Sequence, residues 1–346
     1  MLRVLRACVA SVGAVGLLVG SATPASAAPR PFQAVDLGSL SPPTDNTGLG
    51  YSSASAINDR GVTVGTATAP DGSNHGVRWR PNGTIRDLGV GLYPADINNR
   101  GTIVGSVGQS AGASSYGFVW RDGAIQSHID LPGPAFKINE HEQMLLERPN
   151  PLPAQPTYFF RDTDGVVTEF PPGHELNDLN NLGQVIGTVR GATAPASRGF
   201  VWQAHVGIIR DFGPASEGRL INDKGHVVRS EIVFCEECGG HESVDYFYKG
   251  RTRRFVTGGR GERVLAINDK DQVVGSSASL GGDLAAWFWT PKSGRVNLQR
   301  QSSFDGEIAA RDINESTQIV GASQFAIRPD GEGGLDWLTR ATRWAR

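Results

Sequence analysis

Short runs of alternating apolar and polar residues, separated by turns rich in polar residues and glycine, follow one another along most of the chain. One form recurs as "SAINDRGVTVG" at 55, "ADINNRGTIVG" at 95, "LAINDKDQVVG" at 265 and "RDINESTQIVG" at 311. In each copy a short apolar strand ends in Ile-Asn, a four-residue turn follows, and a second apolar strand begins. Alternation bounded by turn residues is typical of β-hairpins.

The hairpin recurs seven times at intervals of 40 to 46 residues. A period of this length along a chain is typical of repeat architectures, in which each repeat is one supersecondary unit. The asparagine that opens the turn marks each copy, at Asn58, Asn98, Asn139, Asn180, Asn222, Asn268 and Asn314.

Each unit continues with two more strands. An aromatic strand such as "GVRW" or "GFVW" follows a variable loop, and a fourth strand such as "TIRDLG" or "IIRDFG" follows a tight turn. Four short strands in this span, with no helical period, indicate one propeller blade. The last unit lacks a fourth strand, and "FQAVDLGSL" at 32 to 40 resembles one. The sequence therefore predicts an all-β, seven-bladed β-propeller with four-stranded antiparallel blades, in which the N-terminal strand closes the last blade.

The turn residues are of types that stabilise a tight turn. In "NDRG" or "NNRG" the Asn side chain can bond the nearby backbone, and the fourth residue, glycine, can adopt the left-handed conformation. We interpret the seven asparagines in this way rather than as ligands. Glu142, Asp271 and Thr317 replace the glycine, and Glu and Thr adopt that conformation less readily than Asp. We therefore expect different turns in the third and seventh units.

Residues 1–28 have the layout of a secretory signal peptide. "MLRVLR" is basic, "ACVASVGAVGLLVG" is apolar, and "SATPASAA" supplies small residues for cleavage at 27 or 28. The apolar part is too short for a membrane span, although a membrane anchor is the alternative. We expect a secreted protein whose residues 29–346 form one propeller domain, without a membrane anchor after signal removal.

Composition excludes one class of partner. The formal net charge of the whole chain is −2, and no basic run interrupts it. This near-neutral balance gives no electrostatic footprint for nucleic acid. We expect a monomer that uses no cofactor.

The repeated sequence motifs resemble those of a known family. "AINDRGVTVG" followed by "HGVRW" and "IRDLG", and "DINNRGTIVG" followed by "GFVWRDG", are similar to the HAF repeat of secreted bacterial proteins. Only the first copy keeps the histidine of the His-Ala-Phe triplet, at His75, and the resemblance spans residues 32 to 346. It implies an exported, propeller-like protein and carries over no catalytic residues.

Connection lengths indicate where function lies. The turns between first and second strands are short in every unit, whereas the second-to-third and fourth-to-first connections vary, as in "RPNPLPAQP" at 148, "SEIVFCEECGGHESV" at 230 and "QFAIRPDGEGGLDWL" at 324. Both variable classes emerge on one side of a propeller, which we name the loop face, and such a face often binds. The candidate ligand-binding residues there are His174, Glu175, Glu217, Arg219, Glu262, Arg263, Asp305, Glu307 and Arg311.

These charges have mixed sign, which suits neutral or zwitterionic partners better than polyanions. Simple solvation of charged loop residues is the alternative. Five tryptophans recur at one position of the unit and are interpreted as packing between sheets: Trp79, Trp120, Trp202, Trp289 and Trp344. Trp337 lies outside that position, and we place it in the last long loop as an exposed aromatic contact.

"CEECGGH" contains the two cysteines that remain after the signal, Cys235 and Cys238. An exported chain favours a disulfide between them. A zinc site with His241 and redox catalysis are the alternatives, but structural zinc needs four ligands. We expect no metal site.

Three functions compete. A secreted module that binds a glycan, a peptide or another small extracellular ligand is favoured, because the scaffold is regular and the metalloprotease signature "HExxH" is absent from the sequence. A hydrolase or lyase at the channel mouth is the second, with Glu175 and His174 or Asp305 and Glu307 as its acidic and basic groups; fold alone is a weak warrant for it. A structural component of the cell envelope is the third.

Overall fold

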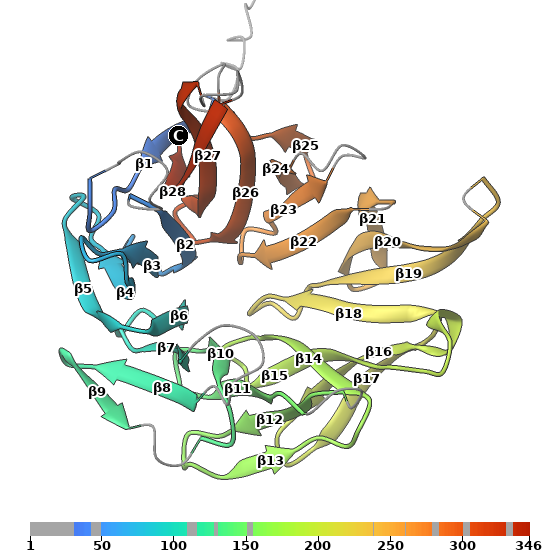
Figure 1. Ribbon diagram of the computed structural model, residues 1–346. Helices are drawn as coiled ribbons and strands as arrows, with labels where there is room; N and C mark the ends of the chain where they lie inside the picture. The colour runs from blue at the N-terminus through green and yellow to red at the C-terminus, as the bar shows by residue number, and fades with distance from the viewer. Residues whose placement is uncertain are drawn as a thin grey trace, which may run out of the picture. The chain divides into compact units, whose positions relative to one another are not determined.

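The strands assemble into a ring of blades (Figure 1). The computed structural model describes residues 31–42, 50–108, 116–127, 131–150, 155–237, 239–259, 261–278, 284–299, 305–329 and 335–346. Within them lie seven four-stranded antiparallel sheets, numbered here as blades 1 to 7 in chain order, and residues Pro31–Arg346 form one compact unit. The seven-bladed propeller predicted from the repeat is confirmed.

In each blade the strands run from the innermost to the outermost. Blade 1 contains β2 (Ser52–Ile57), β3 (Thr63–Thr68), β4 (Asn74–Trp79) and β5 (Ile85–Val90). Blade 2 contains β6 (Leu92–Ile97), β7 (Ile103–Val107), β8 (Tyr116–Arg121) and β9 (Ala124–Ser127). Blade 3 contains β10 (Ala135–Ile138), β11 (Met144–Arg148), β12 (Thr157–Arg161) and β13 (Val167–Glu169).

The remaining blades follow the same order. Blade 4 contains β14 (His174–Leu179), β15 (Gln184–Val189), β16 (Arg198–Gln203) and β17 (Gly207–Pro214), with the 3-10 turn η1 (Ala194–Ala196) before β16. Blade 5 contains β18 (Ser216–Ile221), β19 (Val227–Cys235), β20 (Gly240–Lys249) and β21 (Thr252–Gly258). Blade 6 contains β22 (Glu262–Ile267), β23 (Val273–Ala278), β24 (Leu284–Thr290) and β25 (Gly294–Asn297). Blade 7 contains β26 (Asp305–Ile313), β27 (Ile319–Pro329), β28 (Leu335–Ala345) and β1 (Gln33–Asp36).

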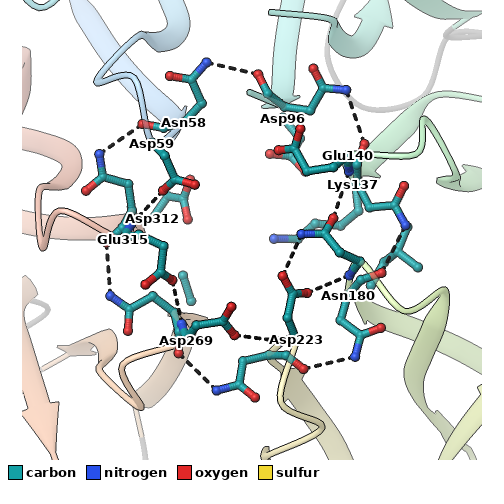
Figure 2. Close-up of a pocket in the computed structure, with 18 of the residues that line it drawn as sticks. Asn58, Asp59, Asp96, Lys137, Glu140, Asn180, Asp223, Asp269, Asp312 and Glu315 are labelled. Atoms are coloured by element: carbon teal, nitrogen blue, oxygen red, sulfur yellow. Dashed lines mark hydrogen bonds between the residues drawn. The ribbon is translucent and has the colours of Figure 1, made fainter. Parts of the chain in front are cut away.

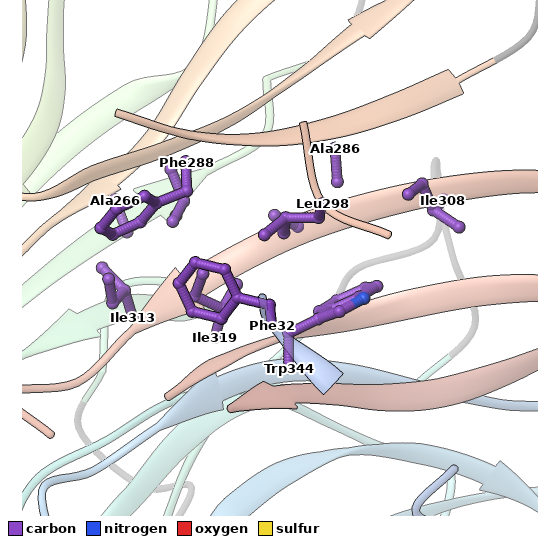
Figure 3. Packing of buried hydrophobic residues seen from close by; sticks show 11 residues of the cluster. Phe32, Ala266, Ala286, Phe288, Leu298, Ile308, Ile313, Ile319 and Trp344 are labelled. Atoms are coloured by element: carbon purple, nitrogen blue, oxygen red, sulfur yellow. The ribbon is translucent and has the colours of Figure 1, made fainter. Parts of the chain in front are cut away.

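The N-terminal strand closes the ring, as the sequence predicts. β1 pairs antiparallel with β28, from Gln33 opposite Ala345 to Asp36 opposite Thr342. Phe32 is 3% exposed and packs in the core between blades 6 and 7 with Trp344 (Figure 3). Because this pairing joins the two ends of the chain within one sheet, β28 is not left as an open edge.

The hairpin turns share one geometry. In each, the Asn side-chain oxygen accepts a backbone N–H from the residue four positions on, as from Val62 to Asn58 at 3.0 Å and from Gln318 to Asn314 at 2.9 Å. The predicted local bonding of these asparagines is therefore confirmed. Glu142 and Thr317 have φ of 62° and 61°, close to the 73° of Gly61. The expectation that the third and seventh turns differ is wrong, because the Asn bonds hold the turn in the left-handed conformation whatever residue stands there.

Two of the predicted loops are instead strands. "SEIVFCEECGGHESV" forms the outer half of the β19–β20 hairpin, in which Cys235 pairs with Gly240. "QFAIRPDGEGGLDWL" likewise contributes to β27 and β28, and Trp337 pairs with Ala326 inside that hairpin. The placement of Trp337 in a loop is therefore wrong, since antiparallel pairing continues outward from the blade. Four of the five recurring tryptophans are buried and Trp202 is half-buried, which confirms that they pack in the core.

Candidate functional site

The innermost strands β2, β6, β10, β14, β18, β22 and β26 surround the central channel. Each carries a bulge at the same place, where the register shifts just before its last two residues, as between Ala54 and Ala56. A bulge bends a strand and redirects its side chains. The residues directly after the bulge are Ala56, Asp96, Lys137, Asp178, Leu220, Ala266 and Asp312. The four charged ones come together in the channel, whereas the three apolar ones pack in hydrophobic clusters between blades.

The seven turn asparagines form a closed ring of hydrogen bonds at the channel end opposite the loop face (Figure 2). Each side-chain amide donates to the backbone carbonyl of the asparagine in the next blade, at 3.0 to 3.2 Å. The last link runs from Asn314 to Asn58. The bond within the turn uses only the oxygen of each Asn side chain. The sequence analysis did not predict the second bond, in which the side-chain N–H joins neighbouring blades.

A second ring lies beside the first. The residue after each asparagine offers a side-chain oxygen to the backbone N–H of its counterpart in the preceding blade, at 2.6 to 2.8 Å. Five of its members are acidic and two are asparagines: Asp59, Asn99, Glu140, Asn181, Asp223, Asp269 and Glu315. The side chains at this end of the channel are thus engaged in holding the blades together, around a cavity of about 230 Å³.

A partly buried charged cluster lies in the channel between the cavity at the short-turn end and the loop face. Lys137 Nζ lies 3.5 Å from Asp178 Oδ1. The carboxylate of Asp96 accepts the backbone N–H of Ile138 in the next blade, and those of Asp178 and Asp312 accept equivalent N–H groups across blade boundaries, at 2.8 to 3.0 Å. Three carboxylates therefore face one ammonium in the interior, while each also links two blades.

The pKa values in this cluster follow from burial and charge. Burial raises the pKa of Asp96 to about 7, against the opposing effect of Lys137. Burial also raises the pKa of Asp312. Burial alone would lower the pKa of Lys137, but Asp178, Asp96 and Asp312 raise it above its ordinary value, so the ammonium stays charged.

On the loop-face side of this cluster, the channel opens into a cavity of about 430 Å³. Tyr93 and Phe136 contribute aromatic walls, while Lys137 and Asp96 lie at its base. Arg311 also lines it; this side chain is exposed and makes no hydrogen bond to a described residue. Apolar walls with a few polar groups, one of them with a perturbed pKa, are typical of ligand sites.

An ion-pair chain connects blades 4 and 5 on the loop face. The guanidinium of Arg190 bonds the carboxylates of Glu175 and Glu217. Arg219 bonds Glu217 and donates from Nε to Ser230 Oγ at 2.7 Å. The predicted residues Glu175, Glu217 and Arg219 therefore meet, but through Arg190, which sequence reasoning did not single out.

A second cavity, of about 540 Å³, lies between blades 5 and 6. Arg219, Asp245, Glu262 and Arg263 line it, together with His241, Glu242, Ser243, Gly259, Val264 and Leu265. Glu262 is held by Arg295 at 3.0 Å and by the indole N–H of Trp287 at 3.2 Å. Three predicted residues thus share one pocket.

Other predicted residues do not converge. His174 bonds the carbonyl of Pro171 through Nδ1 and packs against Phe200, whereas Glu175 turns to Arg190. The structure thus does not bring His174 and Glu175 together as an acid–base pair, because adjacent strand residues point to opposite faces. Glu307 and Asp305 lie on β26, where the backbone N–H of Glu307 donates to Gln324 at 3.3 Å. Binding by these residues stays a prediction.

Two sequence predictions fall partly or wholly beyond the described residues. The signal peptide, residues 1–28, and Cys238 lie outside them, so the Cys235–Cys238 disulfide stays a prediction. Within the described ranges, no group of three or more His, Cys, Asp or Glu side chains could hold a metal ion. None of the helical turns in those ranges is long and apolar enough to cross a membrane.

Fold and channel together define a seven-bladed β-propeller closed by its N-terminal strand. No protein-family model matches the sequence, and no curated protein matches it. Among solved structures, the chain is similar to the β-propeller domain of the Trilobed protease from Pyrococcus furiosus, with a TM-score of 0.56 and 13% identity over 84% of this chain and 95% of that one. That domain is described as having an open velcro topology, whereas β1 pairs with β28 here.

The chain is also similar to the acylaminoacyl peptidase of Pyrococcus horikoshii, with a TM-score of 0.56 and 12% identity over 84% of this chain. The match covers 52% of that peptidase, so this chain spans about half its length. At these identities both comparisons establish the fold alone.

Proposed function

We propose that the protein is a secreted binding module, related to the HAF-repeat proteins, that holds a glycan, a peptide or another small extracellular ligand on its loop face. One observation carries the proposal: the two ends of the channel are unlike. At the short-turn end the turn asparagines and the residues that follow them are engaged in two closed rings. On the loop face, the side chains of Arg263 and Arg311 are exposed beside cavities and make no hydrogen bond to a described residue.

The sizes and surroundings of the two loop-face cavities support this proposal. Both, at about 430 and 540 Å³, fall in the range of small-molecule sites, which is about 300–1,000 Å³. Each combines an arginine with carboxylates, so the sites suit neutral or zwitterionic ligands better than polyanions. The signal-peptide pattern at 1–28 supports export.

A thermal-shift experiment tests the proposal. Neutral monosaccharides, free amino acids and dipeptides are screened for a rise in Tm, because a ligand that binds only the folded state stabilises it. The double variant Arg263→Gln/Arg311→Gln is compared with Arg60→Gln/Arg100→Gln, which changes two exposed arginines in the short turns. We expect a probe that raises the Tm of the wild type and of the short-turn variant but not of the loop-face variant. Equal shifts in all three proteins would place the site elsewhere.

A further inference from the structure

The gap between blades 5 and 6 differs from the gap between blades 4 and 5 in two exchanged side chains. Arg190 and Ile232 occupy equivalent positions, because their backbone N–H groups donate to Gly173 and Ala215 respectively, each just before the innermost strand of its blade. In the first gap Arg190 joins Glu175 to Glu217. In the second gap Ile232 supplies no cation, and the cavity of about 540 Å³ lies there.

The charge that the following blade presents to the gap is also reversed. Glu217 lies five residues before its turn asparagine, Asn222, and Arg263 lies five residues before Asn268. Where blade 5 presents a carboxylate to the first gap, blade 6 therefore presents a guanidinium to the second. The side chain of Arg263 is exposed and makes no hydrogen bond to a described residue.

The inner wall of the cavity offers an acceptor. Asp245 is 5% exposed, and its Oδ1 accepts the hydroxyl of Ser230. Arg219 Nε lies 4.0 Å from the same Oδ1. No described residue bonds the other carboxylate oxygen, Oδ2, so at the cavity wall this oxygen can accept a hydrogen bond from a ligand. The side chain of Glu242, half-buried at the same cavity, likewise makes no hydrogen bond to a described residue.

We propose that the cavity between blades 5 and 6 binds a small zwitterion, a free amino acid or a short peptide, with its carboxylate on Arg263 and its ammonium on Asp245. Arg263 presents a planar fork of N–H donors that suits a carboxylate. An ammonium supplies the donor that Asp245 Oδ2 lacks. A neutral sugar would leave the charge of Arg263 unpaired, and a polyanion would meet Asp245, Glu242 and Glu262.

This inference rests on the proposed binding function of the loop face and names the ligand class for one of its two cavities. The probes are alanine, alanylalanine, N-acetylalanine and alaninamide, measured by isothermal titration calorimetry. We expect at least one of the two zwitterions to bind, and the acetylated and amidated derivatives, which each lack one charge, to bind about ten-fold or more weakly.

Two variants and a matched control locate the site. Asp245→Asn removes one charge with little change of shape, and Arg263→Gln replaces the guanidinium by a shorter neutral amide; each should weaken binding of the zwitterion about ten-fold to a hundred-fold. Arg60→Gln removes an exposed arginine from a short turn and is the matched control that should leave that affinity unchanged, while Arg311→Gln reports on binding in the neighbouring channel cavity.

Two results would overturn the inference. If affinity were lost in Arg311→Gln and kept in Arg263→Gln and Asp245→Asn, the zwitterion would bind in the channel, and the proposed function would stand while this inference failed. If neither zwitterion bound the wild type, this inference would fail, and the monosaccharide screen would decide the proposed function separately.

Discussion

The side-chain amide of Asn314 donates to the backbone carbonyl of Asn58 at 3.0 Å, across 256 positions of the chain. This bond is the last link of the asparagine ring, and it joins blade 7 to blade 1 directly at the channel. The pairing of β1 with β28 closes the same sheet at its outer edge. The ring is therefore closed twice, at its inner and its outer circumference.

Replacing Asn314 by alanine should open the inner closure. The substitution leaves the carbonyl of buried Asn58 and the N–H of half-buried Gln318 without their side-chain partner. We expect the free energy of unfolding to fall by about 1–3 kcal/mol. Urea denaturation measures the change. Asn82→Ala serves as the control, because exposed Asn82 accepts only the local N–H of Thr84; equal losses in both variants would refute a special role for the ring.

Replacing Phe32 by alanine should weaken the outer closure. Phe32 is 3% exposed, and its ring centroid lies 5.0 Å from that of Phe288. Truncating a buried Phe costs about 3–5 kcal/mol. Val35 in the same strand is 44% exposed, so Val35→Ala should change stability by only about 0.5 kcal/mol. Denaturant titration of both variants compares them; a loss for Phe32→Ala no larger than that for Val35→Ala would contradict core packing of the N-terminal segment.

Most of the architecture could be predicted because it repeats. Seven copies of a hairpin with one spacing fix the number of blades, and the unmatched strand at residues 32–40 reveals the closure. The length of the β19–β20 hairpin could not be read in the same way. Residues such as "CEEC" have no strand periodicity, and only pairing with Gly240 and its neighbours extends the strands to Cys235.

The candidate site was less predictable, for physical reasons. The bond from each asparagine to the next blade depends on how closely the turns approach around the ring, which no local pattern encodes. Arg190 was missed because it follows a strand in an unremarkable loop, although it joins two predicted glutamates. The channel cluster did leave a signal. Charged residues stand two positions before the turn asparagine in segments that are otherwise mostly apolar, at Asp96, Lys137 and Asp312.

Stability should fall as pH rises through the range in which Asp96 ionises. In the folded protein burial raises the pKa of Asp96 from 3.8 to about 7, so the folded state holds a proton that the unfolded state has already released. The free energy of unfolding therefore decreases between about pH 4 and pH 7, by up to about 1.4 kcal/mol per pH unit from this group. Asp96→Asn removes the titration while keeping the shape of the side chain.

Chemical denaturation at pH 5 and pH 8 measures this contribution. The difference in unfolding free energy between the two pH values should shrink in Asp96→Asn by at least about 1.4 kcal/mol, the equivalent of one pKa unit. Asp164→Asn, at an exposed turn, is the control and should keep the wild-type difference. An unchanged difference in Asp96→Asn would mean that Asp96 ionises in the folded protein much as it does in the unfolded chain.

Removing the cation of the channel cluster should destabilise the protein in a pH-dependent way, unlike a simple packing defect. Lys137→Met keeps much of the volume but leaves Asp178, Asp96 and Asp312 without their counter-charge. Removing one partner of a buried ion pair costs about 3–5 kcal/mol, and we expect a loss of this size at pH 8. At pH 5 the loss should be smaller, because protonation of Asp96 neutralises part of the repulsion. Denaturation of wild type and variant at both pH values separates the two causes, since a loss that did not depend on pH would reflect packing around residue 137 rather than charge.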